Sequence, residues 1–146
     1  MHNKKRRGIS PVIATVILIA IAVAIAIAVA FWAAGLTGAF TRFEKLEITS
    51  AYSTAADTIV LNVKNTGSSD ATITNVFVNG IPIADFSPNG GVSASPSPST
   101  LPRSVATGSE VTLTLKFDSE LSHGVTYDIK VHTASGTDYP KAVVVP

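Results

Sequence analysis

The sequence lacks cysteine, so no disulfide can stabilise it and any folded domain must be held by packing. It also lacks an Asn-x-Ser/Thr sequon, which excludes N-glycosylation of that type. There is no phosphate-binding loop and no nucleophile elbow. The histidines and the candidate acidic ligands occur in no metal-binding or catalytic spacing: His2, His123, His132, Asp118, Glu120, Asp128 and Asp138. We therefore expect no enzymatic activity, no cofactor and no metal site.

Charge is absent from the whole stretch between Gly8 and Thr41, and the residues just before it form the basic cluster Lys4-Lys5-Arg6-Arg7. The formal net charge is +1, from eleven basic and ten acidic residues. Without residues 1–8, seven basic and ten acidic residues remain, a net charge of −3. The rest of the chain is therefore mildly acidic, which argues against nucleic acid as a partner because no basic patch is left to neutralise phosphates.

The uncharged stretch is long enough to cross a membrane. A span needs about 20 apolar residues, and residues 9–29 supply them before the run continues to Leu36. An ordinary secretory signal has an apolar region of only about 7–15 residues, although Ala28-Val29-Ala30 resembles its cleavage site. Four basic residues precede the run, whereas Arg42 and Lys45 after it are balanced by Glu44 and Glu47, which predicts a cytoplasmic N-terminus and an exported C-terminal part.

The same stretch predicts a helix. Ser10 suits an N-cap and Pro11 the first helical residue, while Gly35 and Gly38 are the candidate breaks. Residues 19–30 alternate Ile or Val with Ala; a lone strand in lipid would leave its backbone unpaired, so we expect a helix. Its alanines then form two opposed shallow grooves that suit helical neighbours on both sides. The alternative is that Ala, Ile and Val are simply apolar filler.

The string Arg7-Gly8-Ile9-Ser10-Pro11-Val12-Ile13-Ala14-Thr15-Val16-Ile17-Leu18 resembles the N-terminus of archaeal type IV pilins. The resemblance implies that a prepilin peptidase recognises and cleaves the leader, and that an assembly ATPase and a membrane platform protein build a filament from the mature subunits. The recognition and cleavage residues would be Lys4, Lys5, Arg6, Arg7, Gly8 and Ile9. The expected filament core is Ile13, Ile17, Ile21, Ile25, Val29 and Trp32. Ile13 stands where bacterial type IV pilins have Glu, which favours an adhesion-type archaeal pilin.

After the helix, short alternating segments predict an antiparallel β-sandwich. The fold class is therefore α+β: a basic leader at 1–8, a hydrophobic assembly helix at 9–43 and an immunoglobulin-like head of about seven strands at 44–146. The predicted strands begin near Leu46, Ile59, Ile73 (with a bulge), Ile81, Val111, Val125 and Lys141, and Asn79-Gly80 predicts a tight turn. Tyr52 and Val125 are assigned to apolar, core-facing sides.

One long segment, residues 87–104, is predicted to be irregular, with six Ser and four Pro. Its composition suits O-linked sugars, and the candidate acceptors are Ser93, Ser95, Ser97, Ser99 and Thr100. The alternative is a solvated loop without a special role.

The sequence thus predicts the major subunit of an archaeal type IV pilus, made at the cytoplasmic membrane and then polymerised into an extracellular adhesion filament. Fifteen large apolar side chains lie between Ile9 and Leu36. Removing them from water is worth roughly 20–45 kcal/mol at about 1.5–3 kcal/mol each, an upper bound. The alternatives are a monomeric membrane-anchored binding module with an immunoglobulin-like domain, and a minor or tip subunit.

Overall fold

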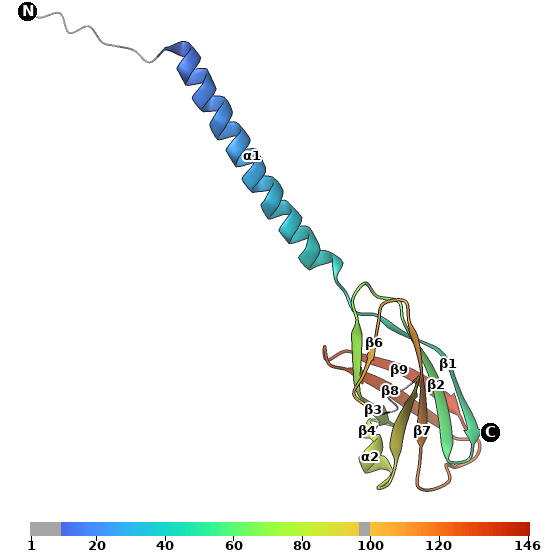
Figure 1. Cartoon of the computed structure of the whole chain (residues 1–146). Coiled ribbons are helices and arrows are strands. Elements are labelled where there is room, and N and C mark those ends of the chain that lie inside the picture. Colours follow the sequence, from blue (N-terminus) through green and yellow to red (C-terminus); the bar gives the residue numbers. More distant parts are fainter. Residues whose placement is uncertain (1–9, 97–99) are drawn as a thin grey trace, which may run out of the picture. The chain divides into compact units, whose positions relative to one another are not determined.

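The computed structural model describes residues 10–96 and 100–146, and the chain divides into two compact units between Thr41 and Arg42. The first contains the helix α1 (Pro11–Thr41), and the second contains the strands and a short helix. Figure 1 shows α1 as one uninterrupted helix and the second unit as two sheets packed face to face. The predicted class, a long apolar helix followed by an antiparallel β-sandwich, is confirmed.

Helix α1 begins at Pro11, where the missing N–H of proline costs no hydrogen bond. The carbonyl oxygen of Ser10 accepts the first intrahelical bond from the N–H of Ala14, at 3.1 Å. The candidate breaks at Gly35 and Gly38 do not interrupt the helix, which ends at Thr41. Its 31 residues correspond to a length of about 46 Å at 1.5 Å per residue.

The described part of the sandwich has nine strands rather than the seven predicted. One sheet has the order β1 (Leu46–Ala55), β2 (Thr58–Asn65), β7 (Glu110–Lys116) and β5 (Gly91–Ser95). The other has the order β4 (Ile81–Pro82), β3 (Ala71–Val78), β8 (Thr126–Thr133) and β9 (Asp138–Val144), with β6 (Arg103–Val105) also paired to β3. All of these pairings are antiparallel.

The core lies between the two sheets and is built from the alternating apolar positions of the central strands. Successive side chains of a strand point to opposite faces, so one apolar set per strand is buried. The fully buried large side chains of the four central strands are Ile59, Leu61, Val63, Ile73, Val76, Val78, Leu113, Leu115, Ile129 and Val131. These are residues whose alternation predicted the strands, and the predictions for β2, β3, β7 and β8 are therefore confirmed.

Two predicted core residues are exposed instead. Tyr52 is 48% exposed because the pairing of β1 with β2 shifts between Ile48 and Ser50. An irregularity of one residue exchanges the faces of everything that follows it, so Ala51 rather than Tyr52 packs against the core. Val125 is 42% exposed because it lies just before β8, outside the alternation that begins at Thr126.

The segment 87–104, predicted to be irregular, contains β5 and the beginning of β6. The short helix α2 (Ile83–Phe86) precedes it, and the ring of Phe86 makes edge-on contacts with Phe117 and Tyr127, at centroid distances of 5.8 and 6.3 Å. Directly after α2, the buried hydroxyl of Ser87 bonds the carboxylate of Asp118 and accepts the N–H of that residue. These contacts hold the start of the segment against the residues that follow β7 in the first sheet and against β8 in the second.

The turn and bulge predicted around β3 are both present. Asn79 and Gly80 have φ values of 50° and 82°, the left-handed conformations that a two-residue hairpin turn requires. The pairing of β3 with β8 shifts between Ile73 and Asn75, which places the bulge in this strand. Both features depend on short local sequence, which is why they could be predicted.

A buried asparagine organises the connection between β2 and β3. The side-chain amide of Asn65, fully buried, donates to the carbonyl oxygens of Ser69 and Val105 at 2.9 and 2.8 Å. Its side-chain oxygen accepts the N–H of Gly67 at 2.9 Å. One side chain therefore satisfies three backbone groups of the turn and of β6, in surroundings where unpaired polar groups are costly.

We expect Asn65→Ala to lower the free energy of unfolding by about 2–5 kcal/mol, because each buried polar group left unpaired costs about 1–3 kcal/mol. Denaturant unfolding of the full chain in detergent, followed by the far-ultraviolet strand signal, measures this loss. Asn89→Ala is the matched control, since Asn89 is exposed, and it should change stability by less than about 0.5 kcal/mol. Equal stability of the two variants would show that the Asn65 network is not stabilising.

Candidate functional site

Helix α1 is apolar on every face, and no residue of it is buried by the described parts of the chain. The predicted filament-core side chains are all exposed, from 49% for Ile17 to 68% for Trp32. Ile13, Ile21, Ile25 and Val29 lie in the same range. A step of four residues overshoots a full turn by about 40°, so this set winds around the helix rather than forming a single stripe.

The few polar side chains of α1 are satisfied within the helix. The hydroxyls of Thr15 and Thr37 donate to the carbonyl oxygens of Val12 and Ala33 at 2.8 and 2.9 Å. At the end of the helix, the hydroxyl of Thr41 donates to the carbonyl of Gly38 at 3.4 Å. Such bonds to the preceding turn let a hydroxyl enter apolar surroundings without losing its partner. By length and composition, α1 is suited to cross a membrane.

The other predicted site residues are the leader and the candidate O-glycosylation residues, of which only some belong to the part of the chain that the structure describes. The leader residues Lys4–Gly8 and Ile9 lie outside the described residues, as do Ser97 and Ser99. Ser93 and Ser95 lie in β5, and both are exposed, as is Thr100, which forms an isolated bridge with Ser93. The exposed hydroxyls therefore belong to a sheet edge rather than to a free loop.

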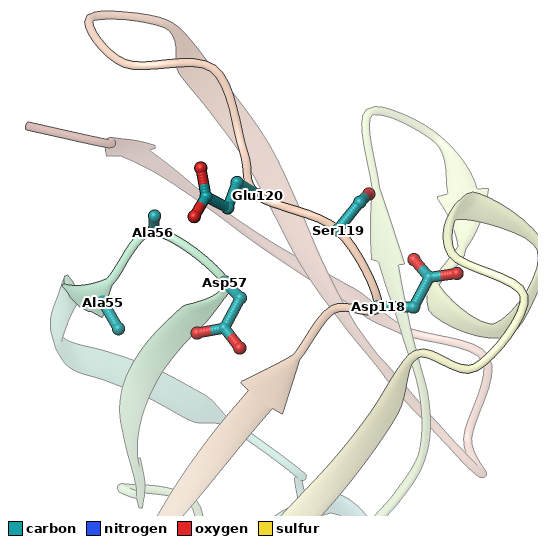
Figure 2. A pocket seen from close by; sticks show the side chains of 6 residues that line it. All are labelled: Ala55, Ala56, Asp57, Asp118, Ser119 and Glu120. Carbon is teal, nitrogen blue, oxygen red and sulfur yellow. The ribbon is translucent and has the colours of Figure 1, made fainter.

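A shallow cleft of about 350 Å³ lies where the β1–β2 turn meets the loop after β7. It is lined by Ala55, Ala56, Asp57, Asp118, Ser119 and Glu120. Figure 2 shows its three carboxylates pointing in different directions rather than toward a common centre. Asp57 accepts the hydroxyl of Thr58 at 2.9 Å, and Asp118 is bound to Ser87. The carboxylates of Asp57 and Asp118 therefore accept hydrogen bonds from neighbouring side chains of the sandwich.

The remaining polar clusters are also small. His132 contacts Asp138 at 2.6 Å on the outer face of β8 and β9, and Nδ1 of His123 lies 2.5 Å from the carbonyl oxygen of Pro146. Among the residues that the structure describes, no group of three or more His, Cys, Asp or Glu side chains could hold a metal ion. Two further clefts, of about 200 and 260 Å³, are smaller than the usual 300–1,000 Å³ of ligand sites.

The connection from the helix to the first strand forms a site that the alternation pattern does not reveal. We call Phe43–Lys45 the strap and Asn65–Ser69 the turn. The carbonyl of Lys45 accepts the N–H groups of Thr66 and Gly67 at 2.9 and 3.1 Å, and that of Phe43 accepts those of Ser68 and Ser69 at 2.9 and 3.2 Å. The N–H of Phe43 in turn donates to the hydroxyl of Ser68 at 3.0 Å.

No family model and no curated protein matches this chain. Its fold is similar to the archaellum periplasmic stator protein FlaG from Sulfolobus acidocaldarius, with a TM-score of 0.55, 21% identity and coverage of 68% of this chain and 99% of that one. A structure of the stator complex of FlaF and FlaG from the same organism matches with a TM-score of 0.51 and 23% identity, and the match covers 68% of this chain and 89% of that one. The unit that ends at Thr41 is too short to supply the matched share, so the likeness is mainly one of the sandwich fold.

Proposed function

We propose that this chain is a subunit of an archaeal type IV pilus whose N-terminal helices form the filament core. The observation that carries the proposal is α1 itself: a helix of 31 residues, uncharged, apolar on all sides and covered by no described part of the chain. A helix with no polar face needs apolar surroundings all round. Identical helices packed together in a filament provide them outside the membrane.

The length of α1 supports a polymer over a simple anchor. The hydrocarbon layer of a membrane is about 30 Å thick, whereas α1 extends for about 46 Å without a charged residue. In lipid, bundling identical helices gains little from hydrophobicity, because lipid is equally apolar. Assembly therefore requires machinery that extracts subunits, which fits the assembly ATPase and platform protein implied by the N-terminal resemblance. Once the filament is in water, the apolar burial holds it together.

Cleavage of the leader by a prepilin peptidase is the step that we propose permits assembly. The four basic residues ahead of Gly8 would otherwise enter a bundle of apolar helices without counter-charges. The sandwich supplies the surface that faces the surroundings, and its exposed serine and threonine hydroxyls in and beside β5 are candidate attachment points for O-linked sugars. Adhesion or cell contact is the role that we propose for the finished filament.

A second candidate function is a membrane-anchored protein of the cell envelope that binds a protein partner through its sandwich. It is favoured by the fold likeness to FlaG, which is named a periplasmic stator protein and was solved in a complex with FlaF. In that case α1 would remain in the membrane as a single span. The two candidates differ in whether the helices of many copies contact one another.

Shearing of producing cells tests the proposal. We expect the sheared fraction to contain thin filaments by negative-stain microscopy, with this chain as their main protein by mass spectrometry and with Ile9 as its first residue. Membranes solubilised from the same cells are the comparison sample. If the chain occurs only there, as single copies or with a different protein, the second candidate replaces the first.

A further inference from the structure

We propose that the strap, Phe43–Lys45, carries the tension that reaches the sandwich from α1, because it fastens the chain to the turn, Asn65–Ser69, before β1 begins. The inference rests on the proposed function only in assuming that tension reaches the sandwich through α1. The contacts between strap and turn lie within the second unit alone, because both segments belong to residues 42–146.

The strap is held at each of its three residues. Four N–H groups of the turn donate to the carbonyl oxygens of Phe43 and Lys45. The hydroxyl of Tyr139 in β9 donates to the backbone carbonyl oxygen of Glu44 at 3.4 Å. With the bond from the N–H of Phe43 to Ser68, polar contacts reach this short segment from the turn and from the opposite sheet. Only Arg42 separates the last residue of α1 from the first fastened residue.

The backbones of the strap and the turn lie too close together at Gly67 to leave room for a Cβ atom. A Cβ atom placed on Gly67 would lie 2.6 Å from the backbone nitrogen of Lys45 and 2.6 Å from the carbonyl oxygen of Phe43. Since these are backbone atoms, a side chain at position 67 can be accommodated only if the strap moves away. Glycine is therefore required here for close approach of two backbones.

The turn itself is anchored in the core of the sandwich by Asn65, so the strap is fastened to a part of the turn that is held in place. Asn65 is fully buried and holds the N–H of Gly67 and the carbonyl of Ser69 with its own side chain. The same side chain bonds Val105 in β6 of the second sheet. Load that enters at Phe43 is thus passed through the turn to both sheets, in parallel with the pairing of β1 to β2.

Single-molecule pulling on the full chain in lipid nanodiscs tests the inference. Because the chain has no cysteine, handles can be attached through Arg42→Cys, just before the strap, or Glu47→Cys, just after it, each combined with Glu120→Cys. Pulling at position 42 should show the strap opening, with a gain of at most about 11 Å for three residues, before the sandwich unfolds. Pulling at position 47 bypasses the strap.

We expect Gly67→Ala, and more mildly Ser68→Ala, to lower the opening force for the handle at position 42 and to leave the unfolding force at position 47 unchanged. Gly91→Ala is the matched control, because a Cβ there meets nothing within 4 Å. Equal weakening in both geometries would mean that position 67 matters for general stability only, and an unchanged opening force at position 42 would show that the strap bears no load. Either result overturns the inference.

Hydrogen exchange provides a second readout that needs no handles. The amide protons of residues 66–69 should exchange slowly in the unaltered chain and at least about tenfold faster in Gly67→Ala, while the central strands keep their protection. If Gly67→Ala does not fold, Ser68→Ala carries both measurements. Since neither uses filaments, failure of the strap inference is distinguishable from failure of the proposed function.

Discussion

Replacing Ile21 by aspartate should abolish filament formation. Ile21 lies in the uncharged part of α1 and is 51% exposed in the single chain. A carboxylate at the centre of a membrane helix costs about 2.5–3.5 kcal/mol, and an unpaired charge in a bundle of apolar helices costs several kcal/mol as well. Every subunit carries the change, so we expect the filament yield in the sheared fraction to fall by at least about fiftyfold.

Two variants separate this effect from general damage. Ile21→Val keeps the site apolar and should leave the yield within about twofold of the unaltered chain. Ile81→Asp places the same charge on a side chain of the sandwich that is 46% exposed, where it should not affect assembly. Normal filament yield from Ile21→Asp would mean that α1 does not lie in an apolar core.

Gly8→Val should stop assembly one step earlier, by blocking removal of the leader. The N-terminal resemblance implies a small residue before the cleavage point, and valine is both larger and branched at Cβ. The uncut chain would retain the four cations ahead of Gly8, which would have no counter-charges in a helix bundle. We expect the protein to accumulate in membranes at its full precursor mass, with no filaments in the sheared fraction.

Gly8→Ala is the matched substitution, since alanine is also small, and it should be cleaved and assembled. Mass spectrometry of the two variants reads the N-terminus directly. Filaments built from subunits that still begin at Met1 would contradict the proposed role of cleavage, even if the helices form the core.

Much of this fold could be predicted because its signals are local. Pro11 after Ser10 marks the start of α1, and the absence of charge marks its extent. In the central strands, alternating apolar residues such as Leu113 and Leu115 gave both the strand and its buried face. Asn79-Gly80 carried its own turn geometry.

The parts that were missed depend on partners far away in sequence. Tyr52 is exposed because of a pairing irregularity between β1 and β2, which alternation within β1 alone does not show. Strand β5 is rich in Gly and Ser and exists because β7 offers an edge to pair with. The contact between strap and turn joins segments more than twenty residues apart. Its one sequence signal is Gly67. Because the φ of Gly67 is not left-handed, this glycine is needed for the close approach of the strap and not for the turn conformation.

A helical reconstruction of the sheared filaments tests the central claim most directly. We expect a core of closely packed α1 helices from chains whose first residue is Ile9, with the sandwiches outside and every apolar face of α1 in contact with a neighbouring copy. A filament whose core lacks α1, or a preparation in which this chain occurs only as a single membrane span, would contradict it.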